Sequence, residues 1–129
     1  MINSDIYNYI NVLDKAADAA NTRNELLTNN IANVDTPGYK RKDLQFESIL
    51  QLELNSSEPL SKRVKEVNTH LGDFEGVVYT DNSNLSYRLD RNNVDIHTEE
   101  ANLAENQIRY QALIDQMTQE FGRYKTVLQ

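Results

Sequence analysis

Apolar side chains recur at alternating spacings of four and three positions from Ile6 to Val34. This spacing is the heptad seam of a coiled coil, in which two positions in every seven face a partner helix. The pattern predicts a helix over 5–34, and Ser4 and Asp5 can cap its start. The seam has one polar member, Asn24. Its members are Ile6, Ile10, Leu13, Ala17, Ala20, Asn24, Leu27, Ile31 and Val34.

The same alternation returns near the C-terminus and predicts a second helix over 98–128. Asp95 and Thr98 can cap its start, and Glu99 and Glu100 place negative charge at its positive end. Neighbouring residues on a helix diverge by about 100°, so these two glutamates are interpreted as first-turn acids and not as an acid–base pair. The seam has one polar member, Gln107. Its members are Leu103, Gln107, Tyr110, Ile114, Met117, Phe121, Tyr124 and Leu128.

Two seams of similar length predict an antiparallel coiled-coil hairpin with both chain termini at one end. In that register Asn24 and Gln107 stand at the same level, each nine residues from the connected end of its helix. A single polar pair in an apolar seam fixes register, because a slip leaves an amide facing hydrocarbon. We therefore expect these two side chains to meet. The alternative, that each faces solvent or another subunit, stays open at this point.

The segment between the helices has a weaker pattern. After Gly38 it predicts a short helix over 43–54, followed by a turn-rich linker. Short candidate strands follow at 77–80 and 86–89, separated by the turn-forming residues 81–84. The predicted fold is mainly α: a hairpin of heptad helices with a short helix and a small, irregular, partly β middle. One structural domain results, made of residues 1–34, 35–97 and 98–129.

The stretch NNIANVDTPGYKRK at 29–42 ends the first helix with an unusual density of amides. Thr36 precedes proline and is biased away from the helical region, while Gly38 permits a positive backbone angle, so the chain turns there. One interpretation is an asparagine-rich helix end followed by a turn. The other is an interaction surface whose amides pair with a neighbouring subunit. The candidate assembly residues are Asn24, Asn29, Asn30, Ile31, Asn33, Asp35, Thr36, Pro37, Gly38, Tyr39, Gln107 and Tyr110.

Composition excludes several classes of function. The chain has 13 Lys+Arg against 20 Asp+Glu, a net charge of -7, so a nucleic-acid partner is not expected. It has no cysteine, which excludes disulfides and thiolate chemistry. We expect no cleaved signal peptide and no membrane insertion, because no apolar run reaches the length of a signal core or of a span. The basic runs at 40–42 and 62–65 are interpreted as solvated faces.

Candidate catalytic and metal-binding residues are few. His70 and His97 lie in unrelated contexts, with neither a zinc-protease spacing nor a glycine-rich phosphate loop nearby. Asp90, Asn92 and Asp95 are spaced partly like a calcium loop, but Val94 occupies a ligand position and the required glycine is missing. We therefore expect no enzyme activity, no cofactor and no bound metal.

Two longer segments carry a family resemblance. The run LTNNIANVDTPGYKRKDLQF resembles the N-terminal signature of flagellar basal-body rod proteins. The run NNVDIHTEEANLAENQIRYQAL resembles the C-terminal signature of one branch of that family, the FlgB-type proximal rod proteins. One departure is His97, where the family commonly has an acidic residue. Together the two matches cover roughly half of the chain.

The resemblance implies a structural subunit that polymerises into the proximal rod, the drive shaft and export channel through the cell envelope. It implies export through the flagellar type III apparatus without a cleaved signal peptide. The implied partners are other rod proteins, the rod adaptor at the membrane ring and copies of the same chain. Alternatives are the sister proximal rod protein and a cytosolic helical adaptor or export chaperone. Because two seams without neighbours bury little apolar surface, we expect the isolated chain to be largely disordered outside 35–95.

Overall fold

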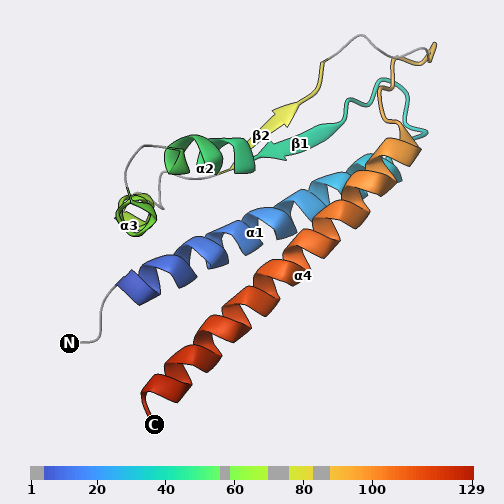
Figure 1. Ribbon diagram of the computed structural model, residues 1–129. Coiled ribbons are helices and arrows are strands. Elements are labelled where there is room, and N and C mark those ends of the chain that lie inside the picture. Colours follow the sequence, from blue (N-terminus) through green and yellow to red (C-terminus); the bar gives the residue numbers. More distant parts are fainter. Residues whose placement is uncertain (1–4, 56–58, 70–75, 83–87) are drawn as a thin grey trace.

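A long helical hairpin dominates the computed structural model, which describes residues 5–55, 59–69, 76–82 and 88–129. Helix α1 (Asp5–Ala32) and helix α4 (Ile96–Val127) run antiparallel, with both chain termini at one end (Figure 1). The middle elements lie along the side of α1 that faces away from α4 (Figure 1). The predicted mainly α hairpin is therefore confirmed. Ser4 and His70 lie outside the described residues.

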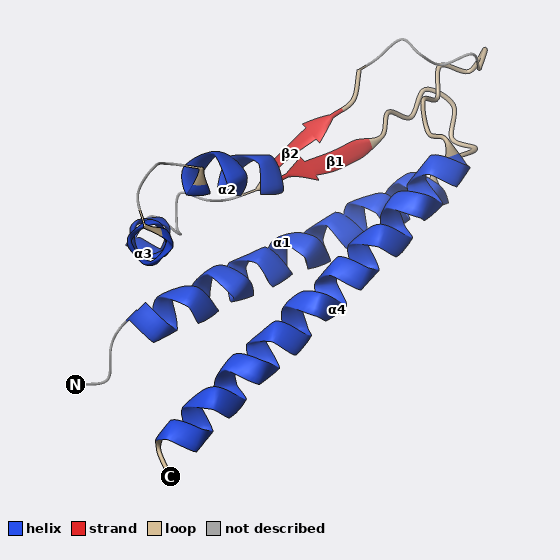
Figure 2. Ribbon diagram, viewed as in Figure 1, coloured by secondary structure: helices blue, strands red, loops and turns tan. Residues whose placement is uncertain are grey.

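The middle segment contains two strands and two short helices: β1 (Lys42–Gln45), α2 (Glu47–Leu54), α3 (Leu60–Thr69) and β2 (Val77–Thr80). β1 and β2 pair antiparallel, with Lys42 opposite Thr80 (Figure 2). The predicted strand over 77–80 is confirmed.

Two predictions for the middle segment need correction, and one helix was missed. The helix expected from residue 43 begins only at Glu47, because residues 42–45 pair with β2 instead. Helix α3 was not predicted at all. The strand expected over 86–89 is not formed at residues 88–89, which lie in a bend and turn, and its other half lies outside the described residues.

Helix α1 buries two faces, because it lies between α4 and the middle segment. Ala17 and Ala20 of the predicted seam are buried, and their small side chains let α4 approach closely. Asn8 lies off that seam, yet it is buried and accepts a hydrogen bond from Asn68 of α3 at 2.7 Å. The apolar core is small for two long helices. Its buried members are Ile10, Val12, Leu13, Ala17, Ala20, Leu27, Phe46, Val67 and Val94.

The seam of α4 is rotated from the predicted one. Leu103 and every seventh residue after it face the partner as expected. At two of the four intervening positions the buried residue is one earlier than predicted: Asn106 and Glu120 are buried, whereas Gln107 is exposed and Phe121 is 55% exposed. The rotation places Arg109 against Glu47 of α2 in an ion pair. The same rotation turns Asn106 inward, where it makes buried hydrogen bonds to α1.

The predicted pairing of Asn24 with Gln107 is wrong by one residue. Asn24 Oδ1 instead accepts a hydrogen bond at 2.8 Å from Asn106 Nδ2, which also donates at 2.7 Å to the carbonyl of Ala20. The level along the hairpin is as predicted, because Tyr7 precedes Asn24 by the same number of positions as Tyr124 follows Gln107. The rings of these two tyrosines lie 6.2 Å apart.

The asparagine pair gives a direct test of this register. Asn106→Leu should lower the free energy of unfolding by about 1–3 kcal/mol, because Asn24 would be left facing an apolar side chain. Gln107→Leu, the matched control one residue away, should change it by less than about 0.5 kcal/mol, because that position is exposed. Thermal and urea unfolding of the purified variants measure both changes. A larger effect at 107 than at 106 would contradict the observed register.

Candidate functional site

Buried polar side chains gather at the closed end of the hairpin, where the end of α1 meets the start of α4 (Figure 1). Asn30 and Asn92 are completely buried and Glu99 is 1% exposed. Such groups need partners, because an unpaired buried polar group is strongly destabilising. We call this cluster the polar junction. Its members are Arg23, Asn30, Tyr39, Arg41, Asp43, Asn92, Asn93 and Glu99.

Asn30 joins α1 to the first strand and to α4. Its Oδ1 accepts from the Lys42 N–H at 2.9 Å, and its Nδ2 donates to the Lys42 carbonyl at 2.7 Å. A neighbouring β-strand would bond the same N–H and carbonyl of Lys42. The Asn30 amide therefore takes the place of a strand at the edge of β1 that faces α1. Nδ2 also donates to Glu99 at 3.0 Å, and Oδ1 accepts from the Tyr39 hydroxyl at 3.2 Å. The amide is thereby fully used within the chain.

Five charged side chains form a continuous ion network at the junction, and one of them is Asp81, whose Oδ2 lies 3.8 Å from Arg41 Nη1. Arg41 Nε donates to Glu99, and its Nη2 lies 3.1 Å from Asp43 Oδ2. Asp43 also accepts from Arg23 of α1, with its Oδ1 2.8 Å from Nε. Burying such charges is unfavourable unless each has a close partner, and removing one partner leaves the others uncompensated. The network therefore holds α1, β1 and α4 in a single arrangement.

The pKa values of the network follow from these contacts. Burial alone would raise the pKa of Asp43, but the bonds from Arg23, the Leu44 N–H and Arg41 outweigh it and the pKa is lowered. Hydrogen bonding to Asp43 raises the pKa of Arg23. Burial and the charge of Glu99 raise the pKa of Tyr39, which favours its protonated, donating form. The pair of Arg23 and Asp43 therefore stays ionised at neutral pH.

The loop before α4 closes the end of α1. Asn92 Nδ2 donates to the carbonyls of Asn33, Val34 and Thr36 at 2.8–2.9 Å. These carbonyls lie at and after the end of the helix, where no intrahelical donor is available. Asn92 Oδ1 accepts from the Val94 N–H at 2.8 Å. The polar end of α1 is thus matched by polar groups of a segment that is distant along the chain.

The turn after α1 projects from this framework. Gly38 has a φ of +72°, which confirms the predicted positive angle, and a Cβ added there would have nothing within 4 Å. Its N–H donates to the Asp90 carbonyl at 2.7 Å, which ties the turn to the loop before α4. Asp35, Thr36 and Pro37 are exposed. The turn is therefore exposed, and the loop before α4 holds its backbone in place.

The predicted assembly residues divide into three groups. Asn30 and Tyr39 belong to the junction, and Asn30 has no accessible surface. Asn24 pairs with Asn106 in the hairpin seam. The remaining residues are half-buried or exposed, and they do not converge on one site. Half-buried are Ile31, Asn33 and Tyr110, and exposed are Asn29, Asp35, Thr36, Pro37, Gly38 and Gln107.

Sequence reasoning missed most of the junction. Arg41 was expected on a solvated basic face, but it is half-buried between two carboxylates. Glu99 lies in the first turn of α4 as expected, yet its side chain turns inward to Arg41. One signal could have indicated this contact. The first family-like segment contains Arg41 and Asp43 and the second contains Glu99, so charges of opposite sign occur in two segments that the hairpin brings together. Asp95, the observed cap of α4, accepts from the N–H groups of His97 and Thr98.

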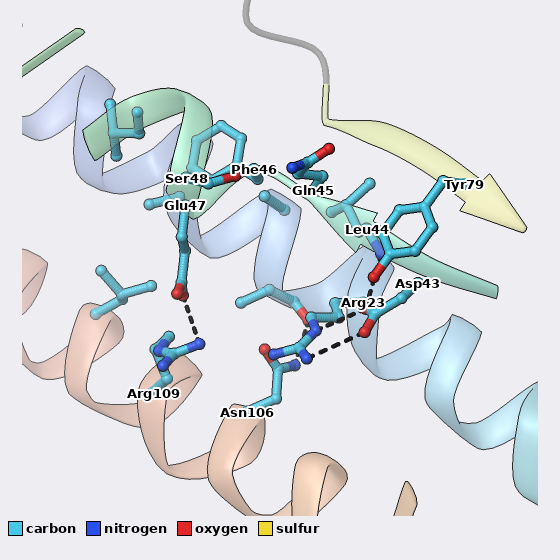
Figure 3. A pocket seen from close by; sticks show the side chains of 15 residues that line it. Arg23, Asp43, Leu44, Gln45, Phe46, Glu47, Ser48, Tyr79, Asn106 and Arg109 are labelled. Carbon is cyan, nitrogen blue, oxygen red and sulfur yellow. Dashed lines mark hydrogen bonds and ion pairs between the residues drawn. The ribbon is translucent and has the colours of Figure 1, made fainter. Parts of the chain in front are cut away.

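A groove of about 520 Å³ lies beside the junction, between the helical hairpin and the β1–α2 segment (Figure 3). Ala16 and Ala19 line it, together with Phe46 and Tyr79. Its charged side chains pair with one another, Arg23 with Asp43 and Arg109 with Glu47 (Figure 3). No group of three or more acidic or histidine side chains that could hold a metal ion occurs among the described residues. The described helices also include none that is long and apolar enough to cross a membrane.

The ion network predicts unequal effects of two matched substitutions. Arg41→Gln should lower the free energy of unfolding by about 3–5 kcal/mol, because Glu99 would stay buried without its cation. Arg109→Gln should lower it by less than about 1 kcal/mol, because the partners of Arg109 are solvent-exposed. Urea unfolding of both variants measures the difference. Equal losses would contradict the assigned role of the junction.

The lowered pKa of Asp43 predicts a loss of stability in acid. The carboxylate is stabilised in the folded chain, so its contribution is present above its ordinary pKa of 3.8 and is lost as pH falls below that value. Thermal unfolding midpoints of the wild type should therefore drop between pH 5 and pH 2 more steeply than those of Asp43→Asn. Parallel profiles for the two proteins would show that another carboxylate dominates.

Comparison with known proteins identifies the family. The family described as "Flagella basal body rod protein" matches residues 10–40. Over 116 residues the chain is 37% identical to the flagellar basal body rod protein FlgB of Bacillus subtilis, covering 90% of this chain and 89% of that protein. FlgB of Escherichia coli is 31% identical over 114 residues, 83% of each chain. FlgB of Borreliella burgdorferi is 30% identical over 119 residues, covering 86% of this chain and 88% of the relative.

These relatives are structural rod proteins, and the matched region at 10–40 runs through α1 into the turn held by the polar junction. Each alignment spans more than four fifths of both proteins, so the likeness includes the hairpin and the middle segment. The chain belongs to the FlgB family of flagellar basal body rod proteins, structural components of the proximal rod.

Proposed function

We propose that this chain polymerises with other rod proteins, and with copies of itself, to build the proximal rod as drive shaft and export channel. The observation that carries the proposal is an exposed turn that the loop before α4 holds in place by hydrogen bonds. Asn92 and the Asp90 carbonyl hold the turn through its backbone, while the side chains of Asp35 and Pro37 are exposed. A surface of this kind is ordered before it meets a partner, so little entropy is lost on binding.

The long helices supply a second kind of contact. Tyr7 of α1 is 57% exposed, and Ile108 and Phe121 of α4 are 73% and 55% exposed. Apolar side chains exposed along a helix are suited to packing against helices of neighbouring subunits. The sparse core within the hairpin leaves further stabilisation to such neighbours. That the terminal helices become ordered only on assembly stays a prediction. The unfolding measurements described above test it as well, because an unfolding transition of the hairpin in the purified chain would contradict it.

The turn residues serve as contacts in this proposal and the junction as their support. Asn29, Asp35, Thr36 and Pro37 would meet a neighbouring subunit, whereas Asn30 and Tyr39 would act only by holding the turn in place. The proposed neighbours are other rod proteins and the rod adaptor at the membrane ring. Delivery would use the flagellar type III apparatus without cleavage of a signal peptide, as the family resemblance implies.

Gly38 offers the sharpest test. Gly38→Val should reduce incorporation of the chain into basal bodies, because a β-branched residue strongly disfavours the positive φ of this turn. Gly38→Asn is the matched control, since asparagine tolerates that backbone region and should retain most assembly. Immunoblots of purified basal bodies and swimming in soft agar measure the outcome. Circular dichroism of each purified chain checks that the helices still form.

The proposal predicts a particular combination of results. Helix content should be unchanged in both variants, while incorporation falls for valine and not for asparagine. Full incorporation and normal swimming with Gly38→Val would remove the turn from the assembly surface. Absence of the wild-type chain from purified basal bodies would overturn the proposed function as a whole.

A further inference from the structure

The β1–β2 sheet stands with one edge against α1 and the other facing away from the hairpin (Figure 2). Asn30 of α1 bonds both backbone groups of Lys42 from the inner side. β2 pairs with the opposite side of β1. β1 is therefore enclosed between α1 and β2, and β2 forms the outer edge of the sheet.

The direction of each backbone group on β2 follows from one hydrogen bond. The Asp81 N–H donates to the Arg41 carbonyl at 2.9 Å, so these residues form a hydrogen-bonded pair at the end of the ladder. Such pairs alternate with non-hydrogen-bonded pairs in an antiparallel ladder. The backbone groups of Tyr79 therefore point toward β1, and those of Val78 and Thr80 point outward.

The two edges of the sheet differ in protection. On β1 the outward groups of Lys42 are bonded by Asn30, and the Leu44 N–H donates to Asp43 Oδ1 at 2.7 Å. On β2, within the described part of the chain, no hydrogen bond reaches the outward groups of Val78 and Thr80. One edge of the sheet is closed by side chains, and the other is available to a further strand.

The side chains of β2 suit strand addition. Val77, Val78 and Tyr79 are 54%, 49% and 41% exposed, although valine and tyrosine favour the half-buried surface of a sheet. Edge strands that avoid pairing usually carry lysine, proline or a bulge. The sequence VVYT has neither lysine nor proline. A sheet of two strands is also marginal alone and gains stability from a third.

We propose that the outer edge of β2 binds an extended strand, flanked by lysine or arginine residues, from a different protein of the basal body. The chain has a net charge of -7, and in the sequence residues 67–95 carry five acids against two bases, so a basic strand complements the charge of this chain. Two β2 edges would pair about a two-fold axis into a closed dimer, which cannot repeat along a rod. They would also bring together two chains of net charge -7. The inference rests on the proposed function, because it places the chain in the rod.

Cross-linking in purified basal bodies tests the identity of the strand. The chain has no cysteine, so Val78→Cys provides one unique attachment point at the outer edge. A reagent that joins a thiol to a lysine amine should link this variant to another basal-body protein, at a lysine beside an extended segment. Peptide mass spectrometry identifies the linked lysine. A product that joins two copies of this chain, or no product with another protein, would overturn the proposal.

Backbone and side-chain variants at the same position test the contact. Val78→Pro removes an outward N–H and leaves the Val77 and Tyr79 groups that pair with β1. It should reduce incorporation into basal bodies about tenfold, because one hydrogen bond to the added strand is lost and the proline ring lies at the edge where that strand would pair. Val78→Lys keeps the backbone but adds a charge that opposes a basic strand, and it should also reduce incorporation. Val78→Thr, the matched control, should incorporate normally.

Unfolding of each purified variant separates loss of the contact from loss of the fold. If Val78→Pro unfolds the chain, Val78→Lys decides the result, because it leaves every backbone group in place. Normal incorporation of Val78→Lys would overturn the inference while leaving the chain a rod component. Failure of the wild-type chain to enter basal bodies would instead remove the proposed function on which the inference rests.

Discussion

The buried carboxylate of Glu99 sets the arrangement of the whole chain. It is 1% exposed, and such a charge is tolerated only beside a cation and hydrogen-bond donors. Arg41 and Asn30 supply them, one from the segment before β1 and one from α1. Glu99 itself belongs to the first turn of α4. α1, α4 and the middle segment must therefore meet at this point, because this carboxylate of α4 is paired with groups of the other two.

This constraint explains how a chain with little apolar core keeps a defined shape. Alanines at two buried seam positions, Ala17 and Ala20, bring the helices close but bury little area each. Register then depends on directional contacts, namely the junction at one end and the Asn24–Asn106 pair within the seam. Polar contacts specify a single alignment because a slip leaves them unpaired. In a larger assembly, such a subunit can present apolar side chains outward without losing its own alignment.

Sequence reasoning succeeded where one residue's environment depends on its near neighbours. The α1 seam, the strand over 77–80 and the positive φ at Gly38 all follow from local periodicity, propensity or sterics. It failed at residues 42–45, where a helical pattern yielded to pairing with β2. It also failed at the α4 seam, where Asn106 takes the buried position beside Asn24. Most of the junction was missed for the same reason. Arg41 looks like one more basic residue in a basic run until its three carboxylate partners, Asp43, Asp81 and Glu99, are known.

The sequence by itself determined the helical hairpin, the level at which its two helices align and the family to which the chain belongs. These properties rest on periodicity and on long matching segments, and both can be read directly from the amino-acid sequence. Only the tertiary structure decided which face of α4 is buried, which asparagine meets Asn24 and which edge of the sheet is left open. These three features depend on groups that are far apart in the sequence and compete for the same partner. Local periodicity and propensity do not show which group is bound.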